Sequence, residues 1–100
     1  MMKLQDLREN IDQINHELVR LLIQRKNISY EIGKIKKDMK IPIYDPSREK
    51  TIFDKLNKKY PNDYQYLIPI FEIIIQESRK SQWFRLLHEK LIYIKSLYVK

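Results

Sequence analysis

Apolar residues recur with the periodicity of an α-helix over the first forty residues. Between residues 4 and 39, apolar side chains recur at steps of three and four, and one position of this series is charged. The members of this heptad seam are Leu4, Leu7, Ile11, Ile14, Leu18, Leu21, Arg25, Ile28, Ile32, Ile35 and Met39. This spacing predicts one long helix. The helix is expected to stop before Pro42, because a residue that precedes proline avoids helical dihedral angles.

A second, shorter helix is predicted after an extended connection over residues 41–44. Asp45 suits its N-cap, and Pro46 suits its first helical position, where a missing N–H costs nothing. An apolar face follows from Ile52, Phe53 and Leu56, and the turn residues at positions 60–63 end the helix.

A third helix is predicted from about residue 63 into the nineties. The side chains expected to face inward are Leu67, Phe71, Ile74, Ile75 and Leu86. Pro69 departs from this pattern, because proline removes a backbone donor and clashes with the preceding turn. We therefore expect this helix to begin later or to kink at Pro69. The fold class is all-α, with a long, a short and a long helix.

The length of the first helix predicts an oligomer. A helix of about 35 residues is ~52 Å long, whereas a compact domain of 100 residues has a radius of gyration near ~13 Å. The apolar seam therefore needs a second long helix, most simply the same helix of another copy. We expect an intertwined helical homodimer.

Composition supports one helical domain over residues 1–100. The chain has one Gly, four Pro and no Cys, so it offers neither a disulfide framework nor thiolate chemistry. Its first ten residues lack the apolar run of a signal peptide, and no apolar stretch approaches the ~20 residues of a membrane span. We expect a complete cytoplasmic domain that does not bind a membrane.

The net charge of +7 leaves three interpretations. Basic chains often bind nucleic acid. Here the Lys residues are spread along the whole chain, which favours a solvated surface and predicts no nucleic-acid partner. In the third interpretation, a few cations point inward toward a small anion.

Cations on the first helix favour the third interpretation. Arg25 occupies a seam position, where a charge is costly unless it is paired; it either sets the helix register or meets an anion. Lys36 follows eleven residues later on nearly the same side, ~16 Å along the axis. Gly33 between them provides either close helix packing or room for a ligand. Arg8 lies ~26 Å from Arg25 on the same helix, so it can approach Arg25 only from the other chain of an antiparallel dimer.

Polar residues on the other helices complete a candidate cavity. Ser78 and Gln82 continue the inward stripe of the third helix and need hydrogen-bond partners, whether from another helix or from a ligand. Arg48 and Glu49 lie in the first turn of the second helix, where a charged pair by itself is usually surface. Together these residues describe a polar cavity for a small polyanion.

The ordered set of these segments resembles the AroQ-type chorismate mutase family. The resemblance covers about residues 4–84, leaves a C-terminal helical extension over about residues 85–100, and rests on these segments: residues 7–12, Arg25, residues 32–36, residues 45–49, residues 77–78 and Gln82. It implies an isomerase that rearranges chorismate to prephenate in phenylalanine and tyrosine biosynthesis. It also implies a dimer of three-helix chains with two shared active sites.

Residue roles follow from that resemblance. Arg8 of the partner chain and Arg25 would bind the two substrate carboxylates, supported by Arg48 and Ser78. Lys36 would contact a carboxylate and the ether oxygen, Gln82 would donate to the same oxygen, and Glu49 with the backbone near Asp45 would hold the ring hydroxyl. This rearrangement needs no metal, redox cofactor, nucleophile or proton transfer. His16 and His88 lie far apart in sequence and are expected at the surface.

Two alternative functions remain, and the role of the C-terminal tail is open. Isochorismate-pyruvate lyase shares the fold and much of the cationic pocket, although residues 45–49 and Ser78 look more like the mutase. A helical dimerisation or nucleic-acid-binding module would leave Arg25, Ser78 and Gln82 unexplained. The tail from about residue 83 either extends the third helix over the dimer or docks a partner, for which an enzyme of the shikimate pathway is the candidate.

Overall fold

Three helices form the chain in the order that the sequence predicts. The computed structural model describes residues 3–98, except for the side chains of residues 84–90. The helices are α1 (Leu4–Met39), α2 (Pro46–Lys59) and α3 (Tyr64–Tyr98), and residues 3–98 contain no strand. The predicted all-α class and the long, short, long order are confirmed. None of these helices has a stretch long and apolar enough to cross a membrane, as far as their residues are described.

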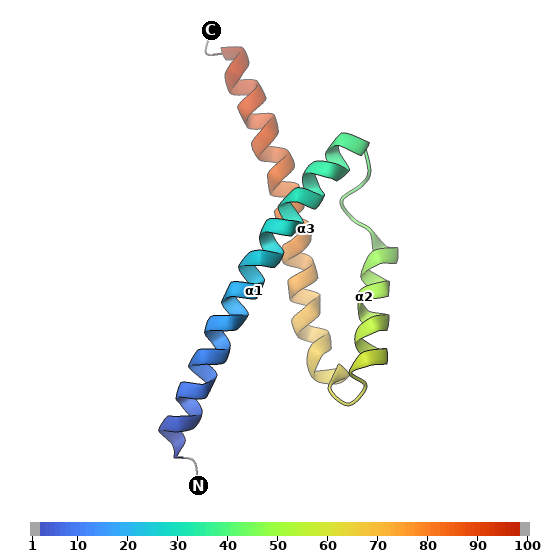
Figure 1. Cartoon of the computed structure of the whole chain (residues 1–100). Helices are drawn as coiled ribbons and strands as arrows, with labels where there is room; N and C mark the ends of the chain where they lie inside the picture. Colours follow the sequence, from blue (N-terminus) through green and yellow to red (C-terminus); the bar gives the residue numbers. More distant parts are fainter. Residues whose placement is uncertain (1–2, 99–100) are drawn as a thin grey trace.

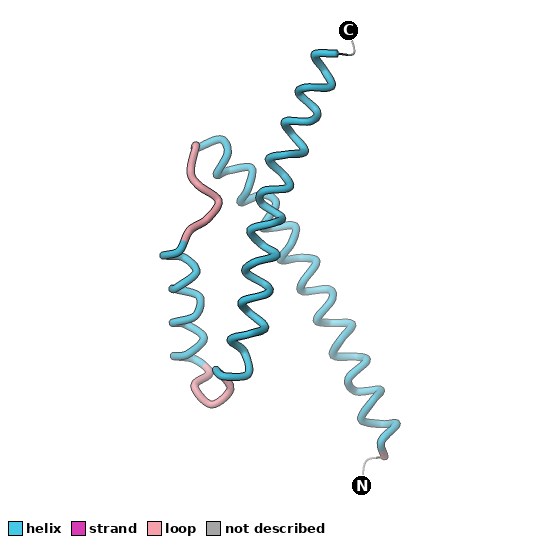
Figure 2. The backbone as a smooth tube through the Cα atoms, turned by 180° about the vertical axis from the view of Figure 1, so that it is seen from behind, coloured by secondary structure: helices cyan, strands magenta, loops and turns pink. Residues whose placement is uncertain are grey.

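The two long helices cross near the middle of α3 and within the C-terminal half of α1, and the short helix lies beside α3 (Figure 1). Figure 1 shows α1 and α3 as an open X, with the N- and C-termini at opposite ends and α2 alongside the first half of α3. Figure 2 shows the same arrangement from behind. The backbones of α1 and α2 both approach α3, whereas no Cα atoms of α1 and α2 lie within 8 Å of each other. The helices α1 and α2 therefore each pack against α3 rather than against each other.

The helix ends follow from local sequence. After α1, Lys40 adopts the left-handed conformation with φ 55° and ψ 41°, and the Ile41 N–H donates to the Lys36 carbonyl at 2.8 Å. This cap satisfies a late carbonyl of the helix just before Pro42. At the start of α2, the Asp45 carboxylate accepts the backbone N–H of Arg48 at 2.9 Å. The predicted end of the first helix and the predicted N-cap are confirmed.

Replacing Lys40 by glycine is expected to stabilise the protein. A side chain in the left-handed region costs about 1 kcal/mol, which glycine avoids. We expect Lys40→Gly to raise the free energy of unfolding by roughly that amount in chemical denaturation at fixed protein concentration. Lys34→Gly is the matched control, because the same change inside the helix should lower stability by about 1 kcal/mol. A loss of stability in both variants would contradict the left-handed cap.

Pro69 does not delay the start of α3. The helix begins at Tyr64, with the Asp63 carbonyl accepting the N–H groups of Tyr66 and Leu67, both at 3.1 Å, and Pro69 lies inside it. The expectation of a later start is wrong. The missing donor of Pro69 affects only the carbonyl one turn earlier, at Gln65, and because Gln65 is exposed, water can hydrogen-bond to that carbonyl.

The interior of the single chain is small and partly polar. Among the described side chains, Ile75 is the only buried apolar one, and the buried polar ones are Ser29 and Gln82. The other predicted inward residues with described side chains are half-buried: Ile52, Phe53, Leu56, Leu67, Phe71 and Ile74. Leu86 lies outside the described side chains. A chain with so little apolar burial leaves much of its hydrophobic surface exposed.

Candidate active site

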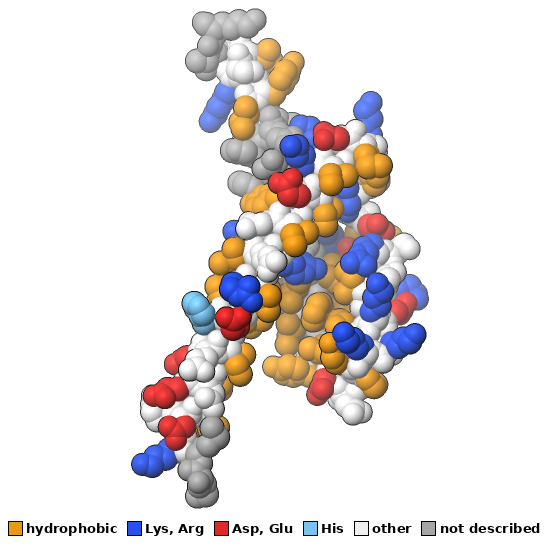
Figure 3. Space-filling model, in the orientation of Figure 1, with side chains coloured by type: hydrophobic (Ala, Val, Ile, Leu, Met, Phe, Trp, Pro, Cys, Tyr) orange, Lys and Arg blue, Asp and Glu red, His pale blue; other side chains and the backbone are white. Residues whose placement is uncertain are grey.

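A cavity of about 350 Å³ lies between the three helices and the connection before α2. That size is within the usual range for small-molecule sites, roughly 300–1,000 Å³. It brings together seven of the eight residues predicted from the sequence, which are Arg25, Lys36, Asp45, Arg48, Glu49, Ser78 and Gln82. In Figure 3, apolar side chains line the hollow between α1 and α2, and Lys and Arg side chains lie among them.

Arg25 is a half-buried cation held by α3. Its Nη1 donates to the Ser78 hydroxyl, and that hydroxyl donates its own proton to the Ile74 carbonyl at 2.9 Å. No described carboxylate oxygen lies within 4.0 Å of an Arg25 nitrogen. Burial lowers the pKa of Arg25 from its usual value, and the positive charge of Arg48 lowers this pKa further. A guanidinium stays protonated regardless, so this corner of the cavity favours an anion.

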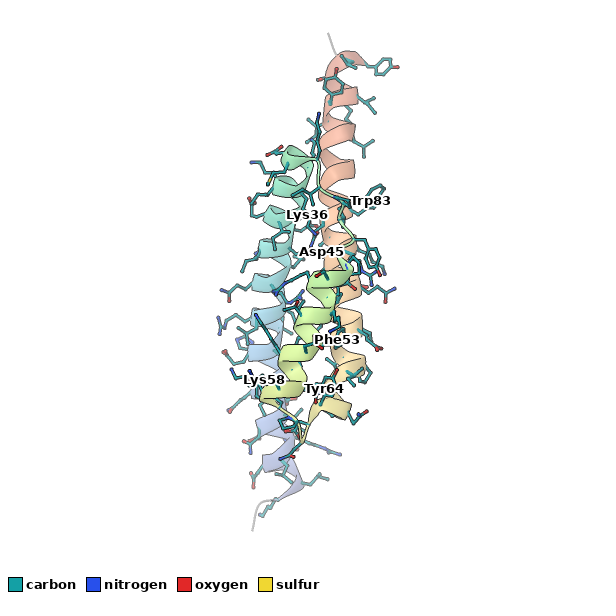
Figure 4. All side chains as sticks on the ribbon, turned by 90° about the vertical axis from the view of Figure 1, so that its right-hand side faces the viewer. Lys36, Asp45, Phe53, Lys58, Tyr64 and Trp83 are labelled. Carbon is teal, nitrogen blue, oxygen red and sulfur yellow. The ribbon has the colours of Figure 1, made fainter. Side chains whose placement is uncertain are left out.

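Lys36 connects α1 with the segment that precedes α2. Its Nζ donates to the backbone carbonyl of Ile43 at 2.8 Å. Figure 4 shows Lys36 on α1 and Asp45 at the start of α2. Both residues line the cavity. An ammonium group has three protons, so the contact with Ile43 leaves two of them for a ligand. The carbonyl of Ile43 therefore holds the Lys36 ammonium group in place. Sequence patterns do not reveal a backbone partner of this kind.

Gln82 lies where α1 and α3 come closest. Its side chain is buried, its Nε2 lies 3.4 Å from the Ser29 hydroxyl, and its Oε1 has no hydrogen-bond partner within the described part of the chain. The Ser29 hydroxyl donates to the Ser78 carbonyl at 3.0 Å. A Cβ atom at Gly33 would meet the Gln82 Cα at 2.8 Å. Of the two interpretations of Gly33, close helix packing is therefore the one that the geometry supports.

Glu49 faces α3 from the first turn of α2. Its Oε2 lies 3.3 Å from the Arg79 Nε, within ion-pair distance but without hydrogen-bond geometry, since that nitrogen has no hydrogen-bond partner among the residues described. The Arg79 guanidinium also lies 5.2 Å from the centre of the Tyr44 ring. Arg79 thus links the connection, α2 and α3. Arg48, in contrast, has an exposed side chain although it borders the cavity.

The comparison with known families shows to which family the chain belongs. Residues 7–83 match the family model described as chorismate mutase type II. The chain belongs to this family. A chorismate mutase of Methanocaldococcus jannaschii is 36% identical over 83 residues, which are 80% of this chain and 84% of that protein. The predicted family and fold class are confirmed.

Other relatives include longer proteins and one solved structure. A bifunctional chorismate mutase/prephenate dehydratase of Aquifex aeolicus is 38% identical over 69 residues, which are 69% of this chain and only 19% of that protein. This chain therefore spans about a fifth of that relative. A solved structure of a conserved hypothetical protein from Pyrococcus furiosus has a TM-score of 0.69 and 33% identity, covering 82% of this chain and 97% of that one.

The eighth predicted residue of this chorismate mutase family member, Arg8, lies outside the cavity. It is exposed on the first part of α1. The prediction placed it in the site of the partner chain, so its role stays a prediction, as do the substrate contacts of the other seven.

Sequence reasoning missed two polar side chains of the cavity, Ser29 and Arg79. Ser29 lies four residues from both Arg25 and Gly33, so helical spacing places it on their face and could have revealed it. Arg79 follows the inward stripe directly and shows no such signal.

The surface position predicted for the histidines is confirmed for one of them. His16 is exposed, and His88 lies outside the described side chains. Among the described residues, no three or more His, Cys, Asp or Glu side chains gather as potential metal ligands.

Proposed function

We propose that the cavity between α1, α2 and α3 is the active site in which this member of the chorismate mutase family converts chorismate to prephenate. The observation that carries the proposal is the half-buried Arg25, which has no carboxylate partner among the described residues and shares the cavity with Arg48 and Lys36. A dianion bound there would neutralise positive charges that have no carboxylate partner among the described residues. Chorismate, with two carboxylates, is such a dianion.

The proposed chemistry consists of positioning and charge stabilisation. In the rearrangement, the ether C–O bond breaks while a C–C bond forms within one molecule, so no group has to be transferred to the protein. Lys36 and Gln82 are the donors proposed for the ether oxygen, which gains negative charge as its bond breaks. One well-aimed donor contributes about 3 kcal/mol, and positioning supplies several more. A millionfold acceleration needs about 8 kcal/mol, which these effects can provide.

The other cavity residues are proposed to bind and orient the substrate. Arg25 would hold one carboxylate, while its guanidinium donates a hydrogen bond to the Ser78 hydroxyl. Arg48 would add positive charge near that carboxylate. Glu49, together with the backbone at Asp45, would hold the ring hydroxyl through hydrogen bonds. The nearby Arg79 would keep the Glu49 carboxylate in place.

A homodimer is proposed because the long seam of α1 remains uncovered in one chain. The apolar seam residues between Leu4 and Met39 are 40–65% exposed. The accessible surface of the chain is 8750 Å², whereas a folded monomer of 12.4 kDa exposes about 6,100 Å². Its radius of gyration of 18.6 Å also exceeds the ~13 Å of a compact domain of this length. Pairing of two α1 helices would cover this surface.

An antiparallel pairing of these helices would complete the active site. Arg8 lies about 26 Å from Arg25 along α1, so it cannot reach the cavity of its own chain. In a two-fold pair, the N-terminal part of one α1 runs beside the C-terminal part of the other. Arg8 of the partner chain would then bind the second carboxylate. The cytoplasmic location and a contact of the tail with a shikimate-pathway enzyme also stay predictions.

Turnover of chorismate by the purified protein tests the proposed function. Loss of the substrate's diene absorbance, with prephenate identified as the product, is the expected result. Lack of turnover would refute the proposal, and release of pyruvate from isochorismate would support the lyase instead. Salt-dependent DNA binding without either reaction would favour the nucleic-acid-binding module.

The pH dependence of turnover is expected to be nearly flat from mildly acidic to mildly basic solution. The amide of Gln82 does not titrate, and although burial lowers the pKa of Arg25, an arginine stays charged over this range. Profiles of kcat and kcat/KM measured in buffers of constant ionic strength provide the check. A steep loss of kcat above neutral pH would contradict the role of Gln82, because it would require a donor that loses its proton there.

A further inference from the structure

We propose that Ser29 is a positioning residue for the reaction, because its hydroxyl orients the Gln82 amide with its NH2 group available to the substrate. This inference rests on the proposed function and adds a residue that the sequence prediction did not contain. Ser29 is 4% exposed and Gln82 is 8% exposed, and both border the cavity. They come from different helices, so their contact depends on how α1 crosses α3.

The direction of the hydrogen bonds determines which end of the amide faces Ser29. A serine hydroxyl has one proton, and Ser29 donates it to the Ser78 carbonyl at 3.0 Å. The Ser29 oxygen is then left only as an acceptor. The group of Gln82 beside it must be a donor, which is Nε2 at 3.4 Å. If the amide were flipped, two acceptors would face each other.

No other described group fixes the orientation of this amide. The Oε1 atom of Gln82 is buried and has no hydrogen-bond partner in the described part of the chain, so Ser29 is the only described side chain that distinguishes the two ends of the amide. Nε2 has two protons. One is directed to Ser29, and the other remains for the ether oxygen of the substrate. A flipped amide would present an acceptor oxygen to an oxygen that gains negative charge, which would oppose the reaction.

The close approach of the helices makes this contact possible. At Gly33, one turn after Ser29, a Cβ atom would lie only 2.8 Å from the Gln82 Cα and 2.9 Å from the Gln82 carbonyl oxygen. Glycine thus lets α3 approach α1 closely enough for the Ser29 hydroxyl to reach both the Ser78 carbonyl and the Gln82 amide. The backbone carbonyl of Ser78 orients the Ser29 hydroxyl, and this hydroxyl in turn orients the Gln82 amide.

Ser29→Ala tests the proposal through a split between kcat and KM. We expect kcat to fall about three- to tenfold, the usual weight of one hydrogen bond, with KM nearly unchanged. The reason is that Gln82 acts on charge that develops only in the transition state, while Arg25 and Lys36 still bind the carboxylates. Ser81→Ala is the matched control: it removes a hydroxyl bonded to a carbonyl of its own helix, next to Gln82, and should leave kcat unchanged.

A double-mutant cycle separates positioning from a general loss of structure. If Ser29 acts through Gln82, Ser29→Ala should have almost no further effect on kcat in a Gln82→Ala background. An equal loss of kcat in both backgrounds, or no loss from Ser29→Ala in the wild type, would overturn the proposal. If the wild-type protein itself fails to turn over chorismate, the proposed function fails instead, so the two failures are distinguishable.

The side-chain NH2 resonances of Gln82 provide a readout that does not need turnover. In ¹⁵N NMR spectra of the free protein, these signals are assigned by their absence from Gln82→Ala. They should shift in Ser29→Ala and stay in place in Ser81→Ala, with backbone spectra showing that both variants fold. Unchanged Gln82 signals in folded Ser29→Ala would refute the hydrogen bond and with it the proposal.

Discussion

Arg25→Ala is expected to lower kcat/KM for chorismate by about 100- to 1,000-fold. Removing one partner of a partly buried, hydrogen-bonded charge pair usually costs roughly 2–5 kcal/mol. In the free protein, Arg25 has no described carboxylate partner and is held by the Ser78 hydroxyl. Its interaction with a substrate carboxylate would therefore be lost without replacement. Initial rates from the loss of diene absorbance give the measurement.

The same variant is expected to keep or raise the stability of the free protein. Burial and the neighbouring charge of Arg48 lower the pKa of Arg25, which means that the folded chain disfavours the charged form. Because that form prevails at neutral pH, the folded protein is destabilised by it, and Ala removes the cost. Loss of activity together with unchanged or higher stability in chemical denaturation would identify a residue kept for binding.

Arg20→Ala is the matched control for Arg25→Ala. Arg20 lies on the same helix but pairs with Glu17 at 3.0 Å on the exposed surface. Its removal should change neither turnover nor stability appreciably, since exposed pairs contribute roughly 0–1 kcal/mol. If Arg25→Ala and Arg20→Ala behaved alike, the proposed anion site would be wrong.

The periodicity of apolar residues predicted the helices and which residues share one face of a helix, because both depend on local spacing. The seam of α1 and the cap at Asp45 needed no knowledge of distant residues. The eleven-residue spacing of Arg25 and Lys36 likewise placed both on one side, and both line the cavity. The roles of individual residues were less accessible, since Arg48 and Glu49 gained theirs only from the family resemblance.

The crossing point of α1 and α3 could not be predicted from spacing. Ser29 is an ordinary polar residue within a helix until α3 is placed against it at Gly33. The carbonyl that fixes Lys36 belongs to Ile43, and any residue type could supply it. Arg79 owes its position to Glu49 and the Tyr44 ring, which lie on separate elements. These contacts depend on tertiary geometry, which a single sequence does not encode in a readable pattern.

Mixing two inactive variants is expected to restore activity if the site is shared between chains. Arg8→Ala removes a residue proposed to serve the partner's cavity, whereas Arg25→Ala removes one that serves its own. In a mixed dimer, one site would lack both arginines and the other would have both. Random pairing makes half of the dimers mixed, and half of their sites are intact. Activity should therefore recover to about a quarter of the wild-type value.

The control for this experiment is a pair of variants whose residues serve the same chain's cavity. Arg25→Ala mixed with Gln82→Ala should remain inactive, because each mixed dimer would then carry one defect in each site. Both mixtures are unfolded together, refolded and assayed with chorismate at equal protein concentration. Recovery in both mixtures would mean that the variants regain activity for another reason. Absence of recovery with Arg8→Ala would mean that Arg8 does not reach the partner's cavity, and the antiparallel pairing of α1 would lose its functional argument.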